Sequence, residues 1–333
     1  MVVRPRIRRT VGVLIALFII VISDFALGNT GDAEQKRSSS IPSPDFRAYQ
    51  TQFFVLETDS DALFAKELSE RLDLFAAQAQ AHFKTLFKRE LPVPRLTLTV
   101  FERREDYIKF TSQHAPHLSN NGGYYDGALR RVVSHRYNTN VALFFHELTH
   151  GMLGELFDDH HFYRYTHEEW PVWLDEGLAE YLAYSPNALS NPGLSHPGKY
   201  AVLFNAIKEK KLPKLQETLS VRAEHFSGPD MSINYAMAWG FLTYLVEKYG
   251  KEGSVATYMD NLLSGKNGDE SFSSAFSMRP SDMESDWLKW IKSQMSDLEP
   301  RLSLFDKGHL WEWSIHEGGE WRFSGNETRA LSS

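Results

Sequence analysis

Cysteine is absent from this chain of 333 residues, and so is any surplus of basic residues. Without cysteine the protein can form neither a disulfide nor a lipid-modified cysteine anchor, so its fold depends on its core and on any metal that it binds. The net charge of −7 argues against nucleic acid as a partner. Internal repeats are lacking too, which excludes a repeat architecture.

The N-terminus carries the features of an export signal. Four arginines precede an apolar run over residues 11–22, and the small residues Ala26 and Gly28 follow it. This order predicts a secretory signal peptide at residues 1–28 and an extracytoplasmic protein, periplasmic or secreted. The alternative is membrane association through an uncleaved anchor at residues 11–27, although the apolar run is short for a span of about 20 residues. Cleavage removes four arginines and one aspartate, which changes the net charge from −7 to −10.

A metal-binding pattern stands at residues 143–150, which read Leu-Phe-Phe-His-Glu-Leu-Thr-His. His146 and His150 are four residues apart, so on a helix both imidazoles lie on one face. Each can present a nitrogen to one ion at about 2.0–2.1 Å, while Glu147, about 100° around the helix, faces the bound water. The pattern predicts metal-assisted hydrolysis.

Because the chain has 13 histidines, a motif of this form can arise by chance and needs support from a second motif. Residues 173–181 supply one. They read Trp-Leu-Asp-Glu-Gly-Leu-Ala-Glu-Tyr, so Glu176 and Glu180 share one face of a second helix. One carboxylate can bind the metal while the other supports a ligand. Gly177 directly follows the first glutamate and permits a close approach between helices.

The two patterns in this order resemble the gluzincin group of zinc metallopeptidases, which includes thermolysin and the aminopeptidase N family. The resemblance implies Zn2+ as the cofactor, with His146, His150 and Glu176 as its ligands. It implies that Glu147 is the general base, which deprotonates a zinc-bound water and later donates the proton to the leaving amine. It also implies that Glu180 hydrogen-bonds a ligating histidine and fixes its ring.

The chain is also similar to uncharacterised bacterial secreted proteins of this group, over roughly residues 51–265. The similarity rests on a Gly-Gly-Tyr-Tyr segment before the zinc helix and a tyrosine-containing helix after the second pattern. By position, Tyr235 is the first candidate to stabilise the oxyanion and His225 the second, although a tyrosine at the start of a helix also serves ordinary packing. Asp175 stands where relatives often have Asn or Ser, and its role stays open.

The polar, Ser- and Pro-containing composition of residues 29–50 predicts a linker, and from residue 51 the pattern changes to strands and helices. With the resemblance, this implies a catalytic domain at residues 51–298. We expect a zincin-like α+β fold, in which a small mixed sheet precedes a pair of zinc helices and a mostly helical C-terminal lobe. The strands and helices expected in the first lobe are 52–57 (strand), 61–88 (helix), 95–101 (strand), 105–113 (helix) and 124–136 (strand).

The first zinc helix is expected to begin near Thr139, capped by its hydroxyl, and to end around Gly154. Pro171 fits the first turn of the second. The later helices are expected at 200–210, 233–249, 254–263 and 280–295. Residues 299–333 predict a tryptophan-rich β-hairpin tail.

The function expected from these features is hydrolysis of a peptide or protein substrate. Residues 122–127 lack the glutamate with which aminopeptidase N relatives hold a free amino terminus, so endopeptidase action is favoured. The competing hypothesis is a non-catalytic envelope protein that keeps the zinc helices for binding or as a scaffold.

Overall fold

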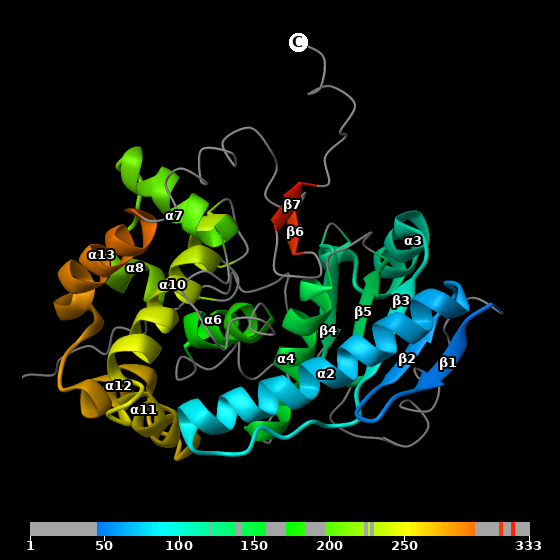
Figure 1. Ribbon diagram of the computed structural model, residues 1–333, viewed down its shortest axis with the longest axis horizontal. Coiled ribbons are helices and arrows are strands. Elements are labelled where there is room, and N and C mark those ends of the chain that lie inside the picture. The colour runs from blue at the N-terminus through cyan, green and yellow to red at the C-terminus, as the bar shows by residue number, and fades with distance from the viewer. Residues whose placement is uncertain are drawn as a thin grey trace, which may run out of the picture. The chain divides into compact units, whose positions relative to one another are not determined.

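The computed structural model describes most of the region expected to fold (Figure 1). The residues described are 45–119, 121–136, 141–157, 171–183, 197–222, 226 and 230–296, together with two short strands at 313–315 and 321–323. The signal peptide expected at residues 1–28, Thr139 and His225 lie outside this set.

A mixed sheet of five strands forms one part of the fold (Figure 1). Its strands are β1 (Arg47–Gln50), β2 (Val55–Thr58), β3 (Thr97–Phe101), β4 (Gly123–Asp126) and β5 (Arg131–His135). They lie in the order β1-β2-β3-β5-β4. The inner strands β2, β3 and β5 run parallel, whereas the edge strands β1 and β4 are antiparallel to their neighbours.

The structure corrects two expectations about these strands. The expected linker ends earlier than residue 50, because residues 47–50 pair with β2 as an edge strand. The single strand expected at 124–136 is a hairpin instead, in which β4 turns back into β5. Its turn is held by the Asp126 side chain, which accepts the Leu129 N–H at 3.1 Å, and by Arg130 in the left-handed region at φ 48°.

One face of the sheet packs with the long helix α2 (Ala62–Phe87). Leu56, Leu98 and Val132 are register partners on this face, and all three are fully buried in the same core as the inner side of α2. The helix begins where Asp61 accepts the Phe64 N–H at 2.9 Å. It therefore confirms the expected helix to within one residue at each end.

The opposite face carries a second, smaller cluster. Phe101, Tyr124 and Val133 of the strands pack there with Tyr107 and Phe110 of α3 (Arg104–His114). Val132 and Val133 are adjacent and so point to opposite faces, which is how one strand serves both clusters. The sheet is thus covered on both sides.

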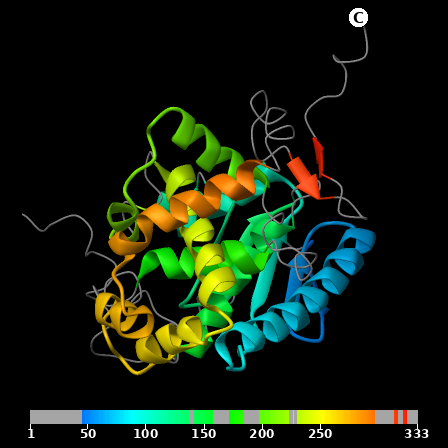
Figure 2. The same ribbon diagram turned by 60° about the vertical axis from the view of Figure 1, so that its left-hand side comes forward.

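Helices build the rest of the fold (Figure 2). They are α4 (Ala142–Leu156), α6 (Val172–Ala183), α7 (Pro197–Lys208), α8 (Leu215–Leu219), α10 (Met231–Tyr249), α11 (Ser254–Leu263), α12 (Gly268–Phe276) and α13 (Pro280–Ser296). The α+β class is as expected, and α11 has the expected bounds. The helix predicted from Thr139 begins at Ala142 instead, after Val141, whose apolar side chain makes no cap hydrogen bond.

In the tail, β6 (Trp313–Ile315) and β7 (Trp321–Phe323) pair antiparallel. The expected boundary between the catalytic domain and the tail, at residues 298 and 299, stays a prediction. Among the helices that the structure describes, none combines the length and the apolar character that a membrane span requires.

Candidate metal centre

The helix that carries the histidines, α4, lies between the sheet and α6. It contacts β4 and β5 on one side and α6 on the other. Its approach to the sheet is close at Gly151, where a Cβ atom would lie 2.3 Å from Leu96 Cδ1 and 3.1 Å from Tyr125 Cε2. Phe145 stacks on Phe75 of α2 with ring centroids 4.3 Å apart. These contacts fix the rotation of the helix and so the direction of its histidines.

The second helix, α6, is buried at every residue and lies between α4 and α10. Pro171 directly precedes it and accepts the Leu174 N–H at 2.9 Å, as its expected place at the helix start requires. Gly177 meets the backbone of α10, because a Cβ atom there would lie 2.9 Å from the Ala238 carbonyl oxygen. The close approach expected at this glycine is confirmed, and it brings α10 near the site.

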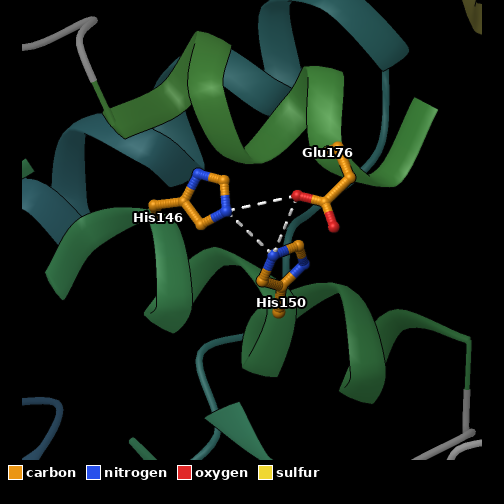
Figure 3. A group of neighbouring side chains, drawn as sticks. All are labelled: His146, His150 and Glu176. Carbon is orange, nitrogen blue, oxygen red and sulfur yellow. Dashed lines mark hydrogen bonds and ion pairs between the residues drawn. The ribbon is translucent and has the colours of Figure 1, made fainter. Parts of the chain in front are cut away.

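His146, His150 and Glu176 converge on one point (Figure 3). The Nε2 atoms of the two histidines are 3.1 Å apart. Glu176 Oε2 lies 3.3 Å from Nε2 of His146 and 3.5 Å from Nε2 of His150. All three side chains are buried, with at most 8 % of each residue exposed.

This spacing fits a divalent cation. Three donors bound at about 2.0–2.1 Å in tetrahedral directions are separated from one another by about 3.3–3.4 Å. The observed distances of 3.1, 3.3 and 3.5 Å fall around that value. Two imidazoles and one carboxylate are also a donor set that zinc prefers, and three protein ligands leave a fourth position for water or substrate.

The charges of the three groups are coupled. Burial acts to lower the pKa of His150, but the carboxylates of Asp175 and Glu176 outweigh it and raise that pKa well above its usual value. Burial likewise acts to lower the pKa of His146, and Glu176 turns the balance so that it is raised. Burial acts to raise the pKa of Glu176, yet the two histidines, His150 foremost, lower it to about 2. The carboxylate is therefore ionised and supplies the negative charge that a cation needs.

Glu147 lies beside this triad, on the same helix as the two histidines, and is partly buried. Loss of hydration raises its pKa, while the positive charge of His146 and a hydrogen bond from the Tyr125 backbone N–H act against that rise. Tyr125 belongs to the edge strand β4. The residue expected to be the base is thus linked to the strand that borders the site.

Each histidine has a carboxylate behind its other ring nitrogen. Asp175, which is fully buried, places Oδ2 3.1 Å from Nδ1 of His150. Glu180 places Oε1 3.6 Å from Nδ1 of His146, which is longer than a hydrogen bond, so the bond expected there stays a prediction. Asp175 had no assigned role in the sequence. Its contact explains a buried acid, since a carboxylate of this kind fixes the tautomer and orientation of a ligating imidazole.

Tyr235 lies near the start of α10, and its ring centroid is 5.9 Å from that of His146. Its position beside the triad agrees with the expectation, whereas its role in catalysis is untested. The structure adds Lys199 of α7, whose Nζ donates to Glu180 Oε1 at 2.9 Å and lies 5.1 Å from the centroid of the Tyr235 ring. Sequence spacing gave no signal for this lysine, because α7 follows the two zinc patterns without a recognisable motif of its own.

A mixed sheet, two crossing helices and a His-His-Glu triad define the α+β architecture of a zincin-like peptidase domain. In agreement, residues 137–293 match a family model described as Peptidase MA superfamily. The match supports a zincin-like peptidase superfamily for this chain, and with the triad it suggests a zinc peptidase. No curated protein matches the chain significantly.

Proposed function

We propose that this protein is a zinc-dependent metallopeptidase that cleaves peptide bonds within a chain. The observation that carries the proposal is the convergence of His146, His150 and Glu176 at the spacing of three tetrahedral ligands, with Glu147 beside them. A bound Zn2+ would polarise the scissile carbonyl and lower the pKa of a water in the site to about 7.

Glu147 is the residue that moves the proton. It accepts a proton from the attacking water and then delivers it to the leaving amine. Its raised pKa, caused first by loss of hydration, suits a carboxylate that must hold a proton between these two events. Tyr235, whose ring lies 5.9 Å from that of His146, donates its hydroxyl hydrogen to the oxyanion.

The edge strand β4 provides a surface for an extended peptide. Among the strands that the structure describes it pairs with β5 alone, so a substrate strand can add along its outer edge, where Glu147 already accepts the Tyr125 N–H. Because Glu147 reaches this strand through the Tyr125 N–H, a peptide bound along it would lie beside the base. Main-chain pairing gives affinity without requiring a chain terminus.

Endopeptidase action is further supported by the acidic residue of this segment. Residues 122–127 contain one acid, Asp126, and its carboxylate is engaged by the Leu129 N–H within the hairpin turn. This carboxylate therefore serves the hairpin turn. Because the N-terminal sequence has the character of a signal, we place the reaction outside the cytoplasm, in the periplasm or beyond the cell.

The deciding experiment is digestion of an unbiased peptide library by the purified mature protein, with and without a chelator, followed by mass spectrometry. We expect cleavages within peptides that stop when zinc is removed and return when it is restored. Glu147→Gln should abolish cleavage and retain zinc. A protein that holds one zinc per chain but cleaves nothing would favour the scaffold hypothesis, and unchanged activity of Glu147→Gln would remove this residue from the mechanism.

A further inference from the structure

Lys199 occupies a place that the proposed chemistry does not explain. It lies in the first turn of α7, and only 16 % of its side chain is exposed. Its Nζ is hydrogen-bonded to Glu180 Oε1 at 2.9 Å, and the same oxygen is 3.6 Å from Nδ1 of His146. Glu180 therefore lies between the lysine and the candidate metal ligand His146.

The ammonium group is fixed in this position by its partner. Glu180 is itself buried, with 10 % of its side chain exposed, and a buried carboxylate is stable only when it is paired. The pairing brings Nζ over the ring of Tyr235, 5.1 Å from its centroid. A cation at that distance attracts the face of an aromatic ring, and the attraction is stronger where water is excluded.

The Tyr235 ring is confined from other directions as well. Phe226 packs against it edge-on, with centroids 5.0 Å apart, and His146 lies at 5.9 Å. Lys199 adds an electrostatic contact to the same ring, and this contact comes from α7. The orientation of the tyrosine thus depends on contacts from α4, α7 and the segment before α10.

We infer that Lys199 is a positioning residue that holds Tyr235 in register with the metal centre through its ion pair with Glu180. This inference rests on the proposed function for its effect on catalysis. A donor to an oxyanion must be held within a few tenths of an ångström to act, so loss of the cation lowers turnover more than substrate binding.

The kinetic test compares Lys199→Met with Lys208→Met. Lys208 lies on the same helix and contacts the ring of Phe204 at 5.9 Å, so it is a matched control. Lys199→Met should lower kcat about tenfold with little change in KM, Lys199→Arg should restore most of the loss, and Lys208→Met should leave kcat unchanged. Lys199→Gln, which keeps a donor for Glu180 but no charge, should behave as Lys199→Met does; a normal kcat in both would overturn the inference.

A double-mutant cycle tests whether the effect passes through Tyr235. In a Tyr235→Phe background, Lys199→Met should have little further effect on kcat, because the hydroxyl that it positions is gone. Equal losses in both backgrounds would overturn the inference. So would a loss of zinc affinity as large as that of Glu180→Gln, because Lys199 would then act on the metal ligand.

A spectroscopic test is independent of activity. The chain has 14 tyrosines, and the ring signal of Tyr235 in isotopically labelled protein is identified by its disappearance in Tyr235→Phe. Lys199→Met should shift this signal, and Lys208→Met should leave it in place. An unmoved signal would overturn the inference even if the enzyme is active, whereas a shifted signal in a protein that cleaves nothing would uphold it and refute the proposed function alone.

Discussion

The two sides of the candidate metal centre differ in the atoms that the zinc helices meet: side chains on one side and backbone on the other. On the sheet side, Gly151 of α4 approaches the side chains of Leu96 and Tyr125. On the helical side, Gly177 of α6 approaches the backbone carbonyl of Ala238. Side chains can move to other rotamers, but the backbone of a buried helix cannot yield without moving the whole helix. The comparison indicates that the helical side sets the geometry of the centre more strictly than the sheet side does.

The largest expected effect comes from removing the one ligand that the helical side supplies. Glu176→Ala leaves two imidazoles from α4, and we expect zinc affinity to fall by more than about 1,000-fold, beyond the 10–100-fold typical of losing an outer partner. Competition with a chromophoric chelator measures this. Glu209→Ala, at an exposed glutamate paired with Lys211, is the control. Retention of tight binding by Glu176→Ala would show that the sheet side holds the metal alone.

The next effect concerns catalysis from the helical side. Tyr235→Phe should lower kcat by about 100-fold, as expected when a donor to an oxyanion is lost, and leave zinc affinity unchanged. Tyr249→Phe, at the far end of the same helix, should have normal kcat. Steady-state kinetics on a peptide found in the library digestion provides the measurement. Full turnover by Tyr235→Phe would assign this tyrosine to packing and leave the chemistry to Glu147.

A pair of glycine substitutions addresses the comparison directly. Gly177→Ala should destabilise the fold by about 1–3 kcal/mol, because the added methyl group meets backbone. Gly151→Ala should change stability by less than about 1 kcal/mol, because the better helix propensity of alanine offsets the displacement of Leu96. Urea unfolding measures the free energy of unfolding of each variant, and the comparison holds when both show the same dependence on urea concentration. Equal losses would mean that both sides of the centre are packed with the same strictness.

The smallest effect is a pH dependence of stability at the contact between α2 and α6. His82 is buried on α2, and its Nε2 lies 3.1 Å from the Tyr181 hydroxyl of α6. Burial lowers the pKa of His82 from its usual 6.5, so the unfolded chain binds more protons than the folded one as pH falls below that value. The stability that neutral His82 contributes is therefore fully present above pH 6.5 and is lost as pH falls below that value.

His82→Gln removes this group and keeps a polar side chain beside Tyr181. The decrease in stability between pH 7.5 and pH 5.5 should be smaller in this variant than in the native chain by a few tenths of a kcal/mol to about 1 kcal/mol. Urea unfolding at each pH compares the two proteins. An identical pH slope would show that His82 takes up no extra proton on unfolding.

Local patterns predicted much of the fold and the centre of the site. The i, i+4 spacing of His146 and His150 is a property of the helix itself, so it survives in any fold that keeps the helix. Long amphipathic segments such as 61–88 and 254–263 also appear nearly as expected, because their periodicity is strong.

The remaining features depend on contacts between distant segments. The role of Asp175 follows only once α6 crosses α4 and turns that carboxylate toward His150. Lys199 is brought to Glu180 by the packing of α7 on α10, for which no local spacing exists. The strand at 47–50 was not predicted because it is short and largely exposed, as the edge of a sheet permits, and so shows no alternation of apolar residues.

The length of α2 has a mechanical consequence. Its 26 residues span about 39 Å at 1.5 Å per residue, enough to run from the sheet to α11 (Figure 1). It is fastened along the way by Phe75 against Phe145 and, just beyond its end, by the ion pair of Arg89 with Asp260 of α11. A long helix that packs on both parts in this way holds the sheet and the helices around α11 at a fixed spacing.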